Sequence, residues 1–142
     1  MTEVVLDAST AVSWVVRSQA TPAALEVLAD QDITLFSAPH LFPSEVRAAL
    51  LKLERRGRLA AAETREGLAA LDVVDVRVQA APTAAGLERL MSLARETQLS
   101  FYDAQYLDLA LHGRRCLVSR DKALLKAARD RGLPVRSTGA SS

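Results

Sequence analysis

The chain has 142 residues, 49% of them hydrophobic and 25% charged, and its formal net charge is +1. These values are ordinary for one globular domain with a single core, and the near-neutral charge argues against a module that binds nucleic acid by charge alone. No apolar run approaches the roughly 18 residues that span a bilayer, and the N-terminus lacks the basic region of a signal peptide, so we expect a cytoplasmic protein with no membrane segment.

Short apolar runs typical of strands alternate with helical patterns along the whole chain. The predicted strands cover residues 3–6, 33–36, 73–78 and 115–118, with a last short strand from Val135. The predicted helices cover residues 11–16, 21–28, 43–57, 58–71, 83–97, 100–111 and 122–128. Because parallel strands need crossover connections, this order predicts an α/β fold, a three-layer α/β/α sandwich around a mainly parallel sheet of roughly five strands. We expect one domain over residues 1–136 and a disordered tail over 137–142.

Four acidic residues stand where helices begin. Asp7 and Asp121 directly follow predicted strands, and Glu45 and Asp103 lie in the first turns of their helices. Because ligands of such sheets bind beyond the carboxyl ends of the strands, the four side chains are expected to converge there. The alternative is that each acid only caps its own helix, with Ser100 and Asp103 forming a capping box. Asp108, about 140° around the helix from Asp103, is expected to be solvated.

Convergence of four carboxylates requires a cation. Two like charges about 4 Å apart repel by roughly 4 kcal/mol at an effective dielectric constant near 20. Ligation by oxygen alone selects Mg²⁺ or Mn²⁺, and the scattered His40, His112 and Cys116 disfavour zinc. A Mg²⁺ ion held in this way promotes hydrolysis of a phosphodiester. Ser9 and Ser119 are placed to donate hydrogen bonds to a carboxylate, a water or a phosphate, or simply to cap their helices.

Four stretches carry a resemblance to a known family. Residues 5–9, 43–46, 102–110 and 117–121 together resemble the PIN-domain ribonucleases, specifically the VapC toxins of bacterial toxin–antitoxin pairs. The resemblance implies a Mg²⁺- or Mn²⁺-dependent endoribonuclease that is a homodimer and is silenced by a cognate antitoxin. It also implies that the metal-binding and catalytic residues are Asp7, Glu45, Asp103 and Asp121. Many relatives have Asn where this chain has Ala48, which removes a polar contact beside the acids.

Two surfaces are predicted from sequence position alone. Arg120 and Lys122, with the basic cluster at 55–58, form an expected rim for RNA, although cations at helix ends are commonly only solvated. An antitoxin segment is expected to cover Trp14 and the valines at 12, 15 and 16, unless Trp14 belongs to the core.

Two other functions remain open from the sequence. The first is a catalytically silent PIN-like module that binds RNA or a partner protein. The second is a phosphatase or another nuclease that uses the same metal.

Overall fold

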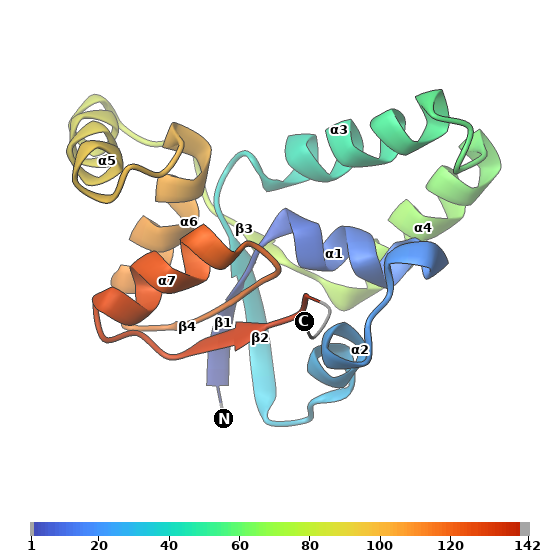
Figure 1. Ribbon diagram of the computed structural model, residues 1–142, viewed down its shortest axis with the longest axis horizontal. Coiled ribbons are helices and arrows are strands. Elements are labelled where there is room, and N and C mark those ends of the chain that lie inside the picture. The colour runs from blue at the N-terminus through green and yellow to red at the C-terminus, as the bar shows by residue number, and fades with distance from the viewer. Residues whose placement is uncertain (1, 140–142) are drawn as a thin grey trace.

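The structure is a computed structural model that describes residues 2–139 (Figure 1). Its strands are β1 (Thr2–Leu6), β2 (Ile33–Ala38), β3 (Arg77–Val78), β4 (Cys116–Ser119) and β5 (Val135–Ser137). Its α-helices are α1 (Ala8–Val15), α2 (Pro22–Ala29), α3 (Phe42–Arg55), α4 (Ala61–Val74), α5 (Ala84–Thr97), α6 (Phe101–Leu111) and α7 (Lys122–Asp130). A 3₁₀-helix, η1 (Arg17–Gln19), connects α1 to α2.

The five strands form one sheet in the order β3-β2-β1-β4-β5, and all four pairings are parallel. In Figure 1, α5, α6 and α7 lie on one side of the sheet and α1 to α4 on the other. Helices on both faces explain why central β1 is an almost continuous apolar run, with Val4, Val5 and Leu6 at most 1% exposed. The predicted three-layer α/β/α sandwich is therefore confirmed.

The parallel sheet places the ends of distant strands at one edge. Leu6 at the end of β1 pairs with Val118 of β4, and Val5 pairs with Ser37 of β2. Helices α1 and α7 begin immediately beyond this edge, and α3 begins four residues after Ala38. The register of the strands thus places the starts of α1, α3 and α7 at the carboxyl edge of the sheet.

The strand predicted over residues 73–78 is wrong except for Arg77 and Val78, which form β3. Helix α4 continues to Val74 and stops where Asp75 adopts the left-handed conformation, with φ of 59°. A Cβ added at Gly67 of α4 would lie 2.9 Å from Cβ of Val15, so the two helices pack closely there. This packing against α1 stabilises the middle of α4, and the helix continues beyond it through the β-branched Val73 and Val74.

The tail predicted from residue 137 begins too early. Ser137 is the last residue of β5, and Thr138 is completely buried. Residues 140–142, also assigned to the tail, lie outside the described residues. Within residues 2–139 no helix has the length and apolar character needed to cross a membrane.

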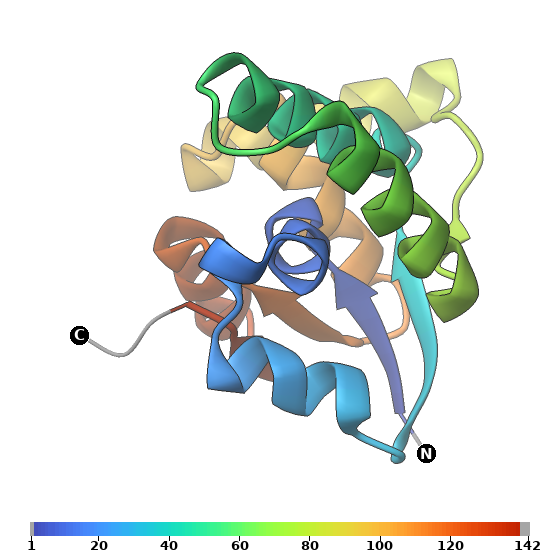
Figure 2. The same ribbon diagram turned by 90° about the vertical axis from the view of Figure 1, so that its right-hand side faces the viewer.

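Most of the apolar residues expected to dock an antitoxin belong to the core. Val12 and Val16 are only 3% and 4% exposed. The Nε1 of partly buried Trp14 donates a 2.8 Å hydrogen bond to the carbonyl of Ala24, and its ring packs edge-on against Phe36 with centroids 5.4 Å apart. Figure 2 shows α1 enclosed by its neighbouring helices. A docking surface made of all four residues is therefore excluded.

Candidate functional site

Asp7 is the most buried of the four acids, with 7% of its surface exposed. Its N–H donates to the carbonyl of Val118 at 3.0 Å, which extends the sheet ladder by one residue. Its Oδ2 accepts hydrogen bonds from Ser9 Oγ at 2.8 Å and from Ser119 Oγ at 2.6 Å. Although Asp7 is the N-cap residue of α1, its side chain makes no capping hydrogen bond. The capping interpretation therefore does not explain this acid.

Burial is the main cause that raises the pKa of Asp7 above its ordinary value. The two serine hydroxyls act in the opposite direction, because they stabilise the charged carboxylate. The negative charge of Asp121 raises the pKa further. Asp7 is thus held in one orientation by hydroxyl groups, and its charge has no cationic partner among residues 2–139.

Glu45 lies in the first turn of α3 and is tied to α6. The Tyr106 hydroxyl donates a 2.7 Å hydrogen bond to its Oε1. Partial burial raises the pKa of Glu45, and the charges of Asp7 and Asp103 add to this effect, whereas the bond from Tyr106 opposes it. The hydrogen bond therefore positions the Glu45 carboxylate, which is repelled by the negative charges of Asp7 and Asp103.

Asp103 opens α6 with Ser100 as its N-cap. The Ser100 Oγ accepts a 3.0 Å hydrogen bond from the Asp103 N–H, which is one half of the predicted capping box. No hydrogen bond from the Ser100 N–H to the Asp103 carboxylate completes the box among the described residues. Partial burial, followed by the charges of Asp121 and Asp7, raises the pKa of Asp103 to about 6. The Asp103 carboxylate is thus repelled by the charges of Asp121 and Asp7, which belong to other parts of the fold.

Asp121 is the acid for which the capping interpretation holds. Its Oδ1 accepts a 2.9 Å hydrogen bond from the Leu124 N–H at the start of α7. Its own N–H donates to Ser119 Oγ at 3.0 Å, so one hydroxyl links Asp121 to Asp7. Because the Asp121 charge raises the pKa of both Asp7 and Asp103, the cap residue also belongs to the cluster.

The cluster carries negative charge without internal compensation. None of the ion pairs within residues 2–139 includes any of its four carboxylates. In the present positions no three His, Cys, Asp or Glu side chains of this described part are grouped tightly enough to hold a metal ion. The donor chemistry nevertheless fits a hard divalent cation, because the available ligands are carboxylate oxygens whose charges oppose one another. The residues that would hold it are Asp7, Glu45, Asp103 and Asp121.

The two cations predicted as an RNA rim lie in different surroundings. Arg120 is partly buried: its Nη1 donates to the Gln19 carbonyl at 3.4 Å, and its N–H donates to Ser9 Oγ at 3.4 Å. Lys122 is exposed in the first turn of α7. Arg120 therefore borders the acidic cluster through Ser9.

Tyr106 was not recognised from the sequence as a partner of the acids. Its helical spacing predicted a core residue, and its ring is indeed completely buried. A buried tyrosine hydroxyl requires a hydrogen-bond partner, which is the signal that points to a nearby polar group. The pattern along one helix does not identify that group, because Glu45 lies 61 residues earlier.

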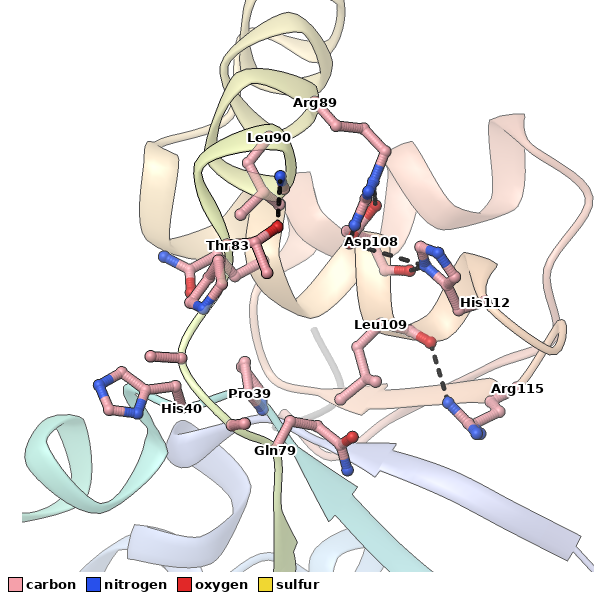
Figure 3. Close-up of a pocket in the computed structure, with 15 residues that line it drawn as sticks. Pro39, His40, Gln79, Thr83, Arg89, Leu90, Asp108, Leu109, His112 and Arg115 are labelled. Atoms are coloured by element: carbon pink, nitrogen blue, oxygen red, sulfur yellow. Dashed lines mark hydrogen bonds and ion pairs between the residues drawn. The ribbon is translucent and has the colours of Figure 1, made fainter.

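A separate pocket of about 430 Å³ lies beside α5 and α6 (Figure 3). Arg89 donates to both carboxylate oxygens of Asp108 at 3.2 and 3.1 Å, and His112 Nδ1 lies 2.9 Å from the Asp108 carbonyl. Asp108 is therefore paired and not simply solvated as expected. None of the four clustered acids lines this pocket, so its size alone does not make it the centre of the proposed chemistry.

Residues 4–130 match the family model of the PIN domain. The crystal structure of PAE2754 from Pyrobaculum aerophilum is similar, with a TM-score of 0.67 and 26% identity, covering 89% of this chain and 84% of that chain. FitAcB from Neisseria gonorrhoeae has a TM-score of 0.62 and 16% identity, with coverages of 95% and 97%. A domain of a functionally unknown protein from Methanocaldococcus jannaschii has a TM-score of 0.54 and 16% identity, with coverages of 100% and 94%. No curated protein matches the chain.

Proposed function

The chain belongs to the PIN-domain family, and from this premise we propose that it is a divalent-metal-dependent endoribonuclease and the toxin of a toxin–antitoxin pair. The observation that carries the enzymatic proposal is the electrostatic coupling of acids from separate elements, seen most clearly at Asp103. Partial burial is the first cause of its raised pKa of about 6, and the charges of Asp121 and Asp7, which lie 18 positions after it and 96 before it in the chain, add to this effect. Such repulsion within a cluster is relieved by a bound cation.

The four carboxylates would hold Mg²⁺, with Mn²⁺ as a substitute. When bound there, the ion would supply charge stabilisation to a phosphodiester undergoing attack by water. Ser9 and Ser119 fix the orientation of Asp7 by donating to its Oδ2, and Tyr106 fixes Glu45 by donating to its Oε1. These three hydroxyls preorganise the carboxylates, which reduces the rearrangement needed when substrate and metal bind.

The toxin role rests on the resemblance of the four sequence motifs to VapC proteins. That resemblance implies a cognate antitoxin as partner and a homodimer as the assembled form. Exposed apolar side chains are available for protein contacts, since Leu51 on α3 and Leu87 and Met91 on α5 are 40–43% exposed. Arg120 and Lys122 would contact the RNA backbone beside the acids.

A cleavage assay tests the enzymatic proposal. Purified protein is incubated with total cellular RNA in EDTA, Mg²⁺ or Mn²⁺, beside the variants Asp7→Asn and Asp103→Asn. Cleavage is expected only with a divalent ion, and both substitutions are expected to abolish it. Asp130→Asn is the matched control, because this acid lies on the exposed surface of α7 outside the cluster. DNA and a phosphomonoester, offered under the same conditions, distinguish an endoribonuclease from another nuclease or a phosphatase.

Binding without cleavage would support the silent-module alternative. If Mg²⁺-loaded wild type binds RNA but leaves it intact, the nuclease proposal is wrong. The toxin role is tested separately, by expressing the chain with and without the product of the neighbouring open reading frame. Growth arrest that the neighbour relieves, together with a stable complex, is the expected result. Absence of both would contradict the toxin assignment.

A further inference from the structure

A second cavity, of about 580 Å³, adjoins the acidic cluster. This volume falls within the range of about 300–1,000 Å³ that is usual for small-molecule sites. Its wall includes Ser9, whose Oγ donates to Asp7, and Arg120, whose N–H donates to that same Oγ. The cavity therefore begins one hydrogen bond away from the carboxylate that the proposed function places at the reaction centre.

This cavity is lined by a positive charge, whereas the adjoining acidic cluster is negative. Arg120 is its cationic residue, and none of the described residues that line it is acidic. The Arg120 guanidinium forms no ion pair within residues 2–139, and its hydrogen bond to the Gln19 carbonyl is long, at 3.4 Å. Because a guanidinium carries five N–H donors, it retains donors that fit a phosphate group.

The remaining walls are partly polar and partly apolar. Ser18 and Gln19 belong to η1, which lies between α1 and α2 (Figure 2). Ala20 and, on α3, Ala49, both partly exposed, supply an apolar surface, to which Val12 of α1, only 3% exposed, adds little. A group that carries an anion, hydroxyls and a flat apolar ring would find a complementary partner for each part. Those are the parts of a nucleotide.

We propose that this cavity binds the nucleotide of an RNA strand that flanks the scissile phosphate, with Arg120 contacting its phosphate. The proposal rests on the endoribonuclease function above. It identifies where the enzyme contacts the RNA strand outside the cleaved bond. Ser18 and Gln19 contact the ribose and the base edge, and Ala20 and Ala49 pack against the base or ribose. The Ala49 side chain is a methyl group, so it leaves room for the ligand and makes no polar contact with it.

A binding experiment in EDTA tests the cavity independently of catalysis. Isotope-labelled protein is titrated with adenosine or uridine monophosphate, and the backbone amide shifts are followed by NMR. Saturable shifts are expected at residues 18–20 and 120, with inorganic phosphate binding more weakly than either nucleotide. Arg120→Gln is expected to weaken nucleotide binding about tenfold, the loss of one charge-assisted contact. Arg129→Gln, on the exposed surface of α7, is expected to bind like wild type.

Ser18→Ala provides a second variant, because an exposed residue of a short 3₁₀-helix can be changed without disturbing the core. It is expected to weaken binding about threefold. In Mg²⁺, Arg120→Gln is expected to raise KM for an RNA oligonucleotide while changing kcat little. Nucleotide binding without RNA cleavage would refute the nuclease proposal and leave the cavity as a nucleotide-binding site without a cleaved bond beside it. Absence of saturable shifts in the cavity, or equal affinity in wild type and both variants, would overturn the assignment.

Discussion

The Tyr106 hydroxyl donates a 2.7 Å hydrogen bond to Oε1 of Glu45, which joins the middle of α6 to the first turn of α3. Tyr106 also follows Asp103 by three residues, so the same helix carries one acid of the cluster and holds another. Burial of the tyrosine and the nearby charge of Glu45 raise the pKa of its hydroxyl, which keeps the donor proton in place. The position of Glu45 relative to Asp103 therefore depends on the Tyr106 hydroxyl.

Tyr106→Phe is expected to destabilise the protein and to loosen Glu45. The substitution preserves the ring but leaves a partly buried carboxylate without its donor, which costs about 1–3 kcal/mol. Because the hydrogen bond lowers the pKa of Glu45, its loss is expected to raise that pKa further and to move the acidic limb of a pH–rate profile to higher pH. Urea denaturation and the pH dependence of RNA cleavage measure the two effects.

Tyr102→Phe is the matched control for this change. Tyr102 lies on the same helix but is 60% exposed, so removal of its hydroxyl should alter neither stability nor the pH profile. Equal behaviour of the two phenylalanine variants would show that Tyr106 only fills space.

Asp103 is expected to make the metal-free protein less stable as the pH rises from about 4 to above 6. Its pKa is about 6 in the folded protein against an ordinary value of 3.8, so the folded state binds more protons across this interval. Stability contributed by this group is therefore present below the unfolded-state pKa and is lost as the pH rises through the folded-state pKa. Asp103→Asn should remove this dependence and should be more stable than wild type at pH 7.5 in EDTA. Melting temperatures between pH 4 and pH 8 test this, and parallel profiles for the two proteins would contradict it.

Mg²⁺ is expected to stabilise wild type more than Asp103→Asn at pH 7.5, and so to narrow the difference between them. At ten times its Kd an ion that binds only the folded state adds about 1.4 kcal/mol, which raises the melting temperature of a domain of this size by about 3–5 °C. Asp103→Asn and Asp7→Asn should show a much smaller increase, whereas Asp130→Asn should match wild type. An equal increase in all four proteins would place ion binding outside the acidic cluster.

The positions of the acids are largely predictable from the sequence, because each depends on local signals. Asp7 directly follows β1 and Asp121 lies two residues after β4, and in a parallel sheet those strand ends must share an edge. The confirmed sheet therefore follows from the alternation of elements. That these acids bind a metal remains a prediction.

The errors arise where contacts between distant residues decide the outcome. Residues 73 and 74 have β-branched side chains typical of a strand, yet α4 extends through them before β3 forms. The ion pair of Asp108 with Arg89 has no local sign in the sequence, because Arg89 lies on α5, 19 residues earlier. The small polar residues after Arg136 suggest disorder by composition, whereas Thr138 is buried because its partners belong to α1, β4 and the N-cap of α2.

Truncation after Arg136, the boundary expected from composition, should destabilise the protein. Thr138 joins three elements: its Oγ1 lies 2.6 Å from Oγ1 of Thr10, its carbonyl accepts from Thr21 Oγ1 at 2.7 Å, and its N–H donates to the Ser119 carbonyl at 2.9 Å. Loss of these partners leaves buried polar groups unpaired, at about 1–3 kcal/mol for each. Because Ser119 also donates to Asp7, the shorter chain should bind Mg²⁺ more weakly as well. Truncation after Gly139 is the matched control, since it retains all three hydrogen bonds. Urea denaturation and Mg²⁺-dependent melting compare the two chains, and equal stability would show that Thr138 does not support the site.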